Sequence, residues 1–205
     1  MKKEYLIFDL DWTLIESMSD TVKIITNYLK QIPNTDFEKV RYVFSTTPWM
    51  ALKKQIELIY NWYNDIDSEK ITLEIYEQLL KQDANFFEWI IEKIKELSNN
   101  YKLFLTTWNS TEVAIKYLTE WWIKDKFELI YWSDKILKWK DHLEIFKEYS
   151  LDKDFYRKSF YIWDWNSDRE FAKSCNIDFI HVWNSKIYKY EIDSVKDIDI
   201  ILSNY

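Results

Sequence analysis

The chain has 205 residues, of which 47% are apolar and 31% charged, with a formal net charge of −7, a pI near 5.0 and one cysteine, Cys175. This composition excludes a disordered acidic chain, and no uncharged apolar run approaches the roughly 18 residues that a membrane span needs. The acidic balance disfavours nucleic acid and anionic membranes as partners. The single cysteine excludes an internal disulfide and the N-terminus is unlike a signal peptide, so we expect a cytoplasmic protein.

The first half of the chain predicts one strand followed by a long helical block. A short apolar run over residues 5–8 ends at Asp9 and is typical of a buried strand. From about residue 17 to residue 80 the pattern is helical throughout, with turn signals at 32–34, 47–48 and 64–68. An amphipathic helix is then predicted over 87–97, before a second buried strand at 102–105.

Strands and helices alternate through the second half. Strands are predicted at 127–131, 160–162 and 179–182. Helical patterns begin near Ser110, Asp141 and Ser167. Two of these starts have capping-box spacing, namely Asn109 with Glu112 and Ser167 with Glu170. Each would place a helix N-terminus just after a strand, where anions bind readily.

This order of elements predicts an α/β fold. Alternating strands and helices with right-handed crossovers form a Rossmann-like parallel sheet that helices cover on both faces. The helical block that interrupts the alternation is best explained as an inserted α-helical cap. The predicted division is a core domain of residues 1–16 and 85–205 and a cap domain of residues 17–84.

The composition has one anomaly, since the chain contains no glycine and 12 tryptophans. At ordinary usage this length would contain roughly 14 glycines, which supply positive φ at turns and helix ends. Six tryptophans directly follow predicted strands, beside small polar residues: Trp12, Trp108, Trp132, Trp163, Trp165 and Trp183. We infer that tryptophan stands where the natural protein has glycine, as a UGA codon read as glycine in some bacteria and translated as tryptophan would produce. The alternative is a naturally tryptophan-rich protein.

Two pairs of carboxylates follow predicted strands. Asp9 and Asp11 stand at the end of the first strand, and Asp164 and Asp168 follow the strand at 160–162. Ligands bind at the carboxyl edge of an open parallel sheet, and like charges this close need a cation or a proton. Hard oxygen ligands from two such loops suit Mg²⁺ together with a substrate phosphate. One pair alone would indicate solvated loop acids, whereas two pairs favour a metal site.

Four motifs occur in order along the chain. They are Asp9-Leu10-Asp11-Trp12-Thr13-Leu14, the strand end Leu103-Phe104-Leu105-Thr106 with the loop Thr107-Trp108-Asn109-Ser110, the helix-opening Lys140, and Trp163-Asp164-Trp165-Asn166-Ser167-Asp168. With these motifs the chain resembles haloacid dehalogenase (HAD) superfamily phosphatases, and among them phosphoglycolate phosphatases with a helical cap. The resemblance covers nearly the whole length. Within the motifs, each departure places tryptophan where the family has glycine.

The resemblance implies an enzyme that forms an aspartyl phosphate. Asp9 would be the nucleophile, and Asp11 would protonate the leaving alkoxide and then activate water. The implied cofactor is Mg²⁺, held by the Asp9 carboxylate, the backbone carbonyl of Asp11 and Asp164, with Asp168 binding directly or through water.

The implied substrate is a small phosphorylated metabolite. Thr106 and Lys140 would bind its phosphoryl oxygens, and Lys138 is the alternative to Lys140. A phosphomutase of the β-phosphoglucomutase type uses the same nucleophile and cap, and a catalytically dead scaffold follows if the tryptophans are genuine, so both alternatives stay open. A dehalogenase is disfavoured, because the second acid of the first motif is needed only for phosphate chemistry. We expect His142 and His181 to be structural.

Overall fold

The computed structural model describes residues 2–16, 18–47, 50–61, 66–83, 85–132, 140–164, 166–183 and 189–205, without the side chains of residues 18–20, 166–168 and 171. At its centre is an all-parallel sheet of six strands in the order β3-β2-β1-β4-β5-β6. The strands are β1 (Tyr5–Phe8), β2 (Lys102–Thr107), β3 (Phe127–Trp132), β4 (Ser159–Trp163), β5 (Asp178–Val182) and β6 (Glu191–Ile192). The predicted parallel sheet is confirmed, with β1 in an interior position.

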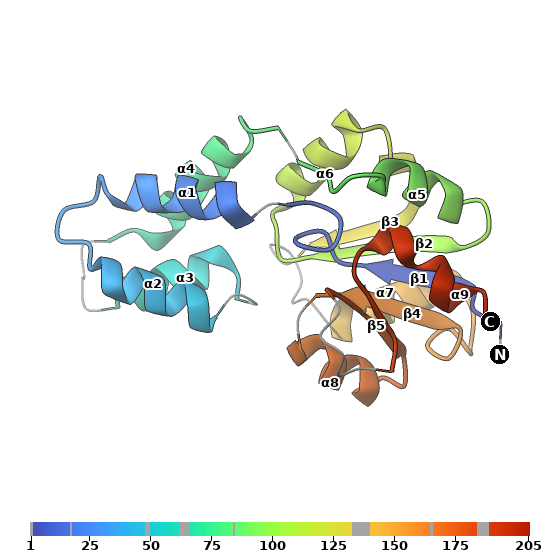
Figure 1. Ribbon diagram of the computed structural model, residues 1–205. Coiled ribbons are helices and arrows are strands. Elements are labelled where there is room, and N and C mark those ends of the chain that lie inside the picture. Colours follow the sequence, from blue (N-terminus) through green and yellow to red (C-terminus); the bar gives the residue numbers. More distant parts are fainter. Residues whose placement is uncertain are drawn as a thin grey trace.

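One group of helices packs on the sheet (Figure 1). These helices are α5 (Ile90–Leu97), α6 (Thr111–Glu120), α7 (Lys140–Ser150), α8 (Asn166–Ser174) and α9 (Asp199–Leu202). α5, α6 and α9 share a buried cluster with Leu6 and Phe8 of β1, whereas α7 and α8 share another with Ile7. Neighbouring strand residues face opposite sides, so helices cover both faces of the sheet. None of the described helices is long and apolar enough to cross a membrane.

The inserted block forms a separate helical lobe, at the left of Figure 1. Its helices are α1 (Met18–Leu29), α2 (Phe37–Thr46), α3 (Leu52–Ile59) and α4 (Ser68–Leu79). Asp36 and Asp67 cap α2 and α4 by accepting hydrogen bonds from backbone N–H groups. No strand occurs among the described residues from 18 to 83, so the inserted α-helical cap is confirmed. The exact division stays a prediction, since residues 17 and 84 lie outside the described part of the chain.

Both predicted capping boxes are wrong in detail. Ser110, not Asn109, is the N-cap of α6, and its hydroxyl accepts a hydrogen bond from the Val113 N–H at 3.4 Å. The Asn109 amide takes part in a tertiary contact instead. α8 begins at Asn166, so Ser167 already lies inside the helix and is not its N-cap. Local spacing alone did not distinguish a cap from a neighbouring polar residue.

Of the six tryptophans predicted just after strands, Trp12 and Trp183 have positive φ, Trp108 does not, and Trp165 lies outside the described residues. Trp132 and Trp163 are themselves the last residues of β3 and β4, so the prediction that they follow these strands is wrong. Positive φ is found at Trp12 (59°), Trp89 (65°), Trp122 (59°) and Trp183 (73°). A left-handed backbone costs a residue with a Cβ atom about 1–2 kcal/mol, whereas glycine adopts it freely. These last four positions therefore favour glycine, as the inferred misreading of glycine codons requires.

Candidate active site

The carboxyl ends of β2, β1 and β4 meet at one edge of the sheet. Phe8, the last residue of β1, pairs with Ile162 of β4 and with the β2 residue that precedes Thr106. Asp9 therefore lies beside Thr106, and its N–H donates to the Ile162 carbonyl at 3.1 Å. Asp164 directly follows the end of β4. Both Asp9 and Thr106 are buried. The fold thus brings three of the four motifs to the same edge.

Asp11 is held by two residues from the loop that follows β2. The Thr107 hydroxyl donates to Asp11 Oδ2 at 3.2 Å, and Asn109 Nδ2 contacts Oδ1 at 3.2 Å and Oδ2 at 3.3 Å. The Thr107 hydroxyl also accepts from the Asn109 N–H at 3.0 Å, which fixes the loop. Sequence reasoning did not single out Thr107 and Asn109 as partners of Asp11. Their polar side chains, directly after a strand that ends at the same edge, were the available signal.

His142 connects the second motif to the third. Its Nδ1 lies 2.7 Å from Thr106 Oγ1, and both side chains are buried. His142 stands in the first turn of α7, two residues after Lys140, which is exposed. The contact therefore places the predicted phosphate-binding lysine near the end of β2. Lys138 lies outside the described residues. The structural role expected of His142 agrees with this buried contact.

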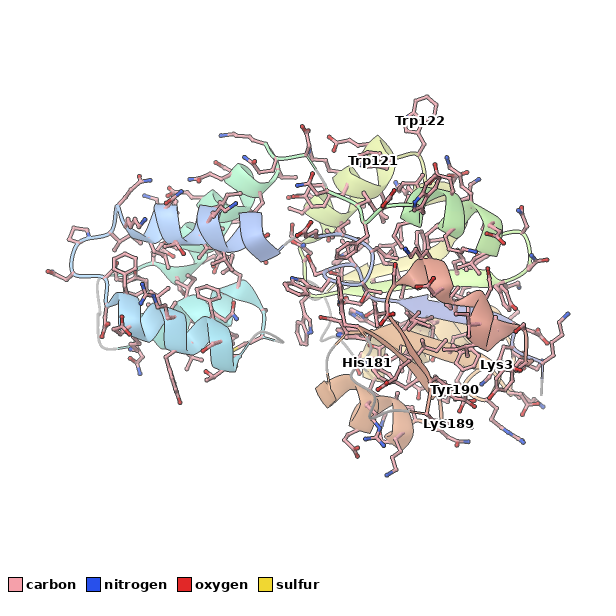
Figure 2. The ribbon with its side chains drawn as sticks, in the orientation of Figure 1. Lys3, Trp121, Trp122, His181, Lys189 and Tyr190 are labelled. Carbon is pink, nitrogen blue, oxygen red and sulfur yellow. The ribbon has the colours of Figure 1, made fainter. Side chains whose placement is uncertain are left out.

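Asp164 is held through its backbone. Its carbonyl accepts a hydrogen bond from His181 Nε2 at 3.0 Å, and burial lowers the pKa of His181, which keeps the ring neutral at pH 7. Because a carbonyl only accepts, the proton of the neutral ring must lie on Nε2. Figure 2 shows where this histidine lies. Asp168 lies in the first turn of α8, and its side chain is outside the described part.

The donors at this edge fit Mg²⁺. Asp9 and Asp164 offer carboxylates and Asp11 offers a backbone carbonyl, which are the hard oxygen ligands that this ion prefers. Among the described side chains, no three His, Cys, Asp or Glu residues gather closely enough to hold a metal. That result is compatible with a site in which one ligand is a backbone carbonyl and another, Asp168, has no described side chain.

Aromatic side chains crowd the turn after β1. Trp183 Nε1 donates to the Trp12 carbonyl at 2.9 Å, and the two rings lie 6.0 Å apart. The ring of Phe87 lies 5.3 Å from that of Trp183. Trp12 directly follows Asp11, the predicted proton-transfer residue, in the sequence. Glycine at positions 12 and 183 would remove both indoles from this edge.

An all-parallel sheet, an inserted helical cap and acids at the carboxyl ends of β1 and β4 together define an α/β enzyme of the HAD type. Residues 6–182 match the family described as haloacid dehalogenase-like hydrolase. The chain belongs to this family and is therefore a hydrolase, so the resemblance found in the four motifs is confirmed. No curated protein matches the sequence significantly.

Solved structures of the same fold align over nearly the whole chain. A Bacillus subtilis protein, YfnB, described as a HAD-hydrolase bound to magnesium, has a TM-score of 0.75 and 16% identity, covering 99% of this chain and 100% of its own. A predicted phosphoglycolate phosphatase from Haemophilus somnus has a TM-score of 0.74 and 18% identity, covering 98% of each chain. A predicted phosphatase from Clostridium acetobutylicum has a TM-score of 0.74 and 20% identity, covering 100% of each. At these identities the likeness concerns the fold.

Proposed function

We propose that this hydrolase is a Mg²⁺-dependent phosphatase that cleaves a small phosphate monoester through an aspartyl-phosphate intermediate. The observation that supports it best is the arrangement after β1, where Asp9 is buried at the strand end and Asp11 is held by Thr107 and Asn109. One acid is thereby available to bond to phosphorus and the other to transfer protons. The structural neighbours described as phosphatases support the same reaction.

In the first half of the reaction, a carboxylate oxygen of Asp9 attacks the phosphorus atom of the ester. A P–O bond forms to Asp9 as the P–O bond to the alcohol breaks. Asp11 enters this step protonated and gives its proton to the departing alkoxide, which leaves as the alcohol. Thr107 and Asn109 orient Asp11 for this transfer.

In the second half, Asp11 is a carboxylate, because it gave its proton to the alcohol in the first half. It takes a proton from a water molecule as that water attacks the phosphorus. The bond between phosphorus and Asp9 breaks, so inorganic phosphate is released and Asp9 returns to its carboxylate form. Asp11 is again protonated, which closes the cycle.

The phosphoryl group and the carboxylate of Asp9 are both negative, so the site must neutralise charge. Thr106 and Lys140 would bind the phosphoryl oxygens. Asp9, Asp164, Asp168 and the backbone carbonyl of Asp11 would hold the metal. Bound Mg²⁺ would supply the remaining positive charge and orient the phosphoryl group. We also propose that the substrate is a small phosphorylated metabolite of the cytoplasm.

Phosphate release from p-nitrophenyl phosphate tests the reaction in a chain with glycine restored at the tryptophan positions. We expect Asp9→Asn to abolish both turnover and phosphoenzyme formation, because only Asp9 forms the covalent bond. Asp11→Asn should still allow slow phosphoenzyme formation, because Asp11 only transfers protons. Asp125→Asn, a matched change at an exposed acid of the turn before β3, should leave the rate unchanged. Parental rates in Asp9→Asn would refute the mechanism.

Metal removal tests the cofactor. We expect EDTA to abolish phosphate release and added Mg²⁺ to restore it, because the donors at the sheet edge are hard oxygens. Full activity in EDTA would contradict the proposed metal dependence. Product analysis with sugar phosphates separates hydrolysis from mutase chemistry, since a mutase returns the phosphoryl group to the sugar, whereas a phosphatase releases it as inorganic phosphate.

A further inference from the structure

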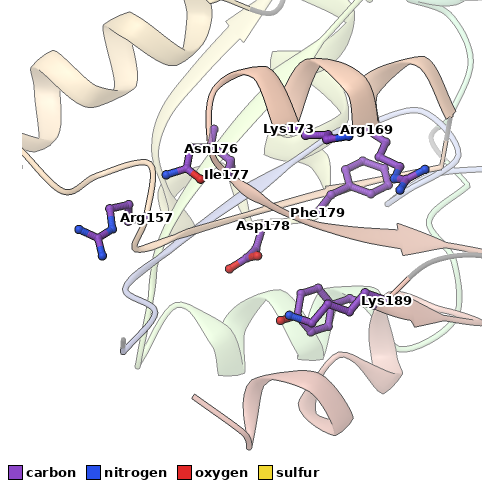
Figure 3. A pocket seen from close by; sticks show the side chains of 9 residues that line it. Arg157, Arg169, Lys173, Asn176, Ile177, Asp178, Phe179 and Lys189 are labelled. Carbon is purple, nitrogen blue, oxygen red and sulfur yellow. The ribbon is translucent and has the colours of Figure 1, made fainter.

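A pocket lined by basic side chains, here called the basic pocket, lies away from the candidate active site. It has a volume of about 460 Å³, and its walls include Arg157, Arg169, Lys173, Lys189, Phe179 and Tyr190. Figure 3 shows these side chains around the start of β5. Arg157 precedes β4, and Lys173 lies in the last turn of α8. The pocket therefore lies toward the amino edge of the sheet, whereas Asp9 and Asp164 stand at the carboxyl edge.

The lining has an excess of positive charge. Its side chains include four cations and one carboxylate, in a chain whose net charge is −7. The carboxylate, Asp178, is already paired, since Lys3 Nζ lies 2.6 Å from its Oδ2. Lys3 is buried and also donates to two backbone carbonyls of the same region, so it is fixed in this place. Asp178 therefore does little to offset the four cations.

Each of the two arginines has a long ion pair with an exposed acid near it in the sequence. Arg157 Nη1 lies 3.9 Å from Asp154, and Arg169 Nη1 lies 4.0 Å from Glu170, with all four side chains at least 46% exposed. Exposed ion pairs at such distances are weak and are screened by solvent, so an incoming anion can replace them. Guanidinium groups bind phosphate through two parallel hydrogen bonds.

The arrangement of the cations suits an extended anion. Arg169 and Lys173 stand four residues apart on α8, so both project from one face of the helix. Lys189 stands on the opposite wall, with its Nζ 4.4 Å from the centre of the Tyr190 ring. Phe179 and Tyr190 add aromatic surface, and the volume falls within the range of about 300–1,000 Å³ found for small-molecule sites.

We propose that the basic pocket binds a small molecule with two or more linked phosphate groups. The phosphate chain lies between the α8 cations and Lys189, beside the aromatic side chains of the pocket wall. Two sources share this chemistry, namely a nucleoside di- or triphosphate and inorganic pyrophosphate. The site is separate from the candidate active site and requires none of its residues.

Isothermal titration of the full glycine-restored chain with pyrophosphate and with ADP tests the proposal, in EDTA so that no metal-bound complex forms at the active site. The six residues used here to define the pocket include no tryptophan, so they are unchanged in that chain. We expect saturable binding that weakens at least about tenfold in Arg169→Gln/Lys173→Gln, because two phosphate contacts are lost. Lys95→Gln/Lys124→Gln changes the net charge equally at exposed sites elsewhere and should have little effect.

Further variants test whether the anion binds in the basic pocket or elsewhere on the protein. Lys189→Gln, on the opposite wall, should also weaken binding, and circular dichroism checks that each variant keeps the parent's melting temperature. Lys140→Gln, at the candidate active site, should leave binding unchanged. Tighter binding of ADP than of pyrophosphate identifies a nucleotide, whereas equal binding identifies the phosphate chain alone. Absence of saturable binding, an equal loss in the Lys95/Lys124 control, or a loss in Lys140→Gln alone overturns the proposal.

Discussion

The end of α6 offers a direct test of whether tryptophan stands in place of glycine. The Trp122 N–H donates to the Thr119 carbonyl at 3.1 Å, and the Ile123 N–H donates to the Leu118 carbonyl at 3.0 Å. These two bonds form a Schellman motif with Trp122 at the left-handed position, where glycine is the usual residue. The end of α8 repeats the pattern with Asn176, a residue that tolerates this backbone well.

The expected gain at position 122 follows from the backbone and the exposure. The left-handed conformation costs a residue with a Cβ atom about 1–2 kcal/mol. Trp122 is 80% exposed, and Figure 2 shows its indole projecting from the fold, so little packing is lost on its removal. Alanine loses the same indole contacts but keeps the backbone cost. We therefore expect Trp122→Gly to be more stable than Trp122→Ala by about 1 kcal/mol, or about 2–4 °C in melting temperature.

Thermal and urea unfolding followed by circular dichroism measure this difference. Trp121 provides the matched control, because it precedes Trp122 but has a φ of −98° that any residue adopts. At position 121 the order should reverse, with alanine more stable than glycine. Equal stability of the alanine and glycine variants at position 122, or the same order at both positions, would refute the reasoning. Glycine at all 12 tryptophan positions should raise both the melting temperature and the phosphatase rate.

Two further predictions concern Asp11, the proposed catalytic acid, and the stability of the fold in acid. Asn109→Ala removes the amide contacts to Asp11 at 3.2 and 3.3 Å. Because hydrogen bonds to charged groups contribute about 1.5–3 kcal/mol, we expect this change to lower kcat about 10–100-fold in steady-state assays. An unchanged kcat would exclude a role for Asn109 in orienting Asp11. Lys158 lies 2.8 Å from Asp152, and its hydrogen bond lowers the pKa of that carboxyl. The stability that this ion pair contributes is present above the unfolded pKa of about 3.9 and is lost as the pH falls through the folded pKa of Asp152. Lys158→Met should therefore lower the free energy of unfolding at pH 7. In strong acid the variant and the parent should have the same free energy of unfolding.

Hydrophobic periodicity in the sequence predicted the strands and helices correctly where the apolar pattern was long enough. β1 was predicted at 5–8 and has those bounds, because four apolar residues lie between charged neighbours. β6 was not predicted, since Glu191 and Ile192 alone make no alternating pattern. Its position depends instead on pairing with the end of β5, where His181 is in register with Glu191. Such pairing is a tertiary property, and no local signal in the sequence specifies it.

The sequence predicted the candidate site less completely than the fold, because the hydrogen bonds of the site join distant parts of the chain. Asn109 and Asp11 are 98 residues apart, and Thr106 and His142 are 36 apart. The sequence indicates that each stands near a strand end, but it does not determine the side-chain partners. Asn109 was predicted to cap α6 from its capping-box spacing with Glu112, but an asparagine amide can also bond to a distant group. The adjacent Ser110 caps the helix instead, which leaves the Asn109 amide to contact Asp11.

The tryptophans at the candidate site differ in what they imply for function. Trp12 and Trp183 have left-handed backbones, and their indoles contact each other at the turn after β1. Glycine at these positions would relieve the backbone strain and open the edge where the proposed mechanism places the substrate. Trp163, in contrast, is a buried residue of β4 packed against Tyr161, so its replacement removes core contacts. Restoring glycine at 12 and 183 should therefore raise stability and widen access to Asp9 together. Restoring it at 163 should instead remove core packing and leave space next to Asp164.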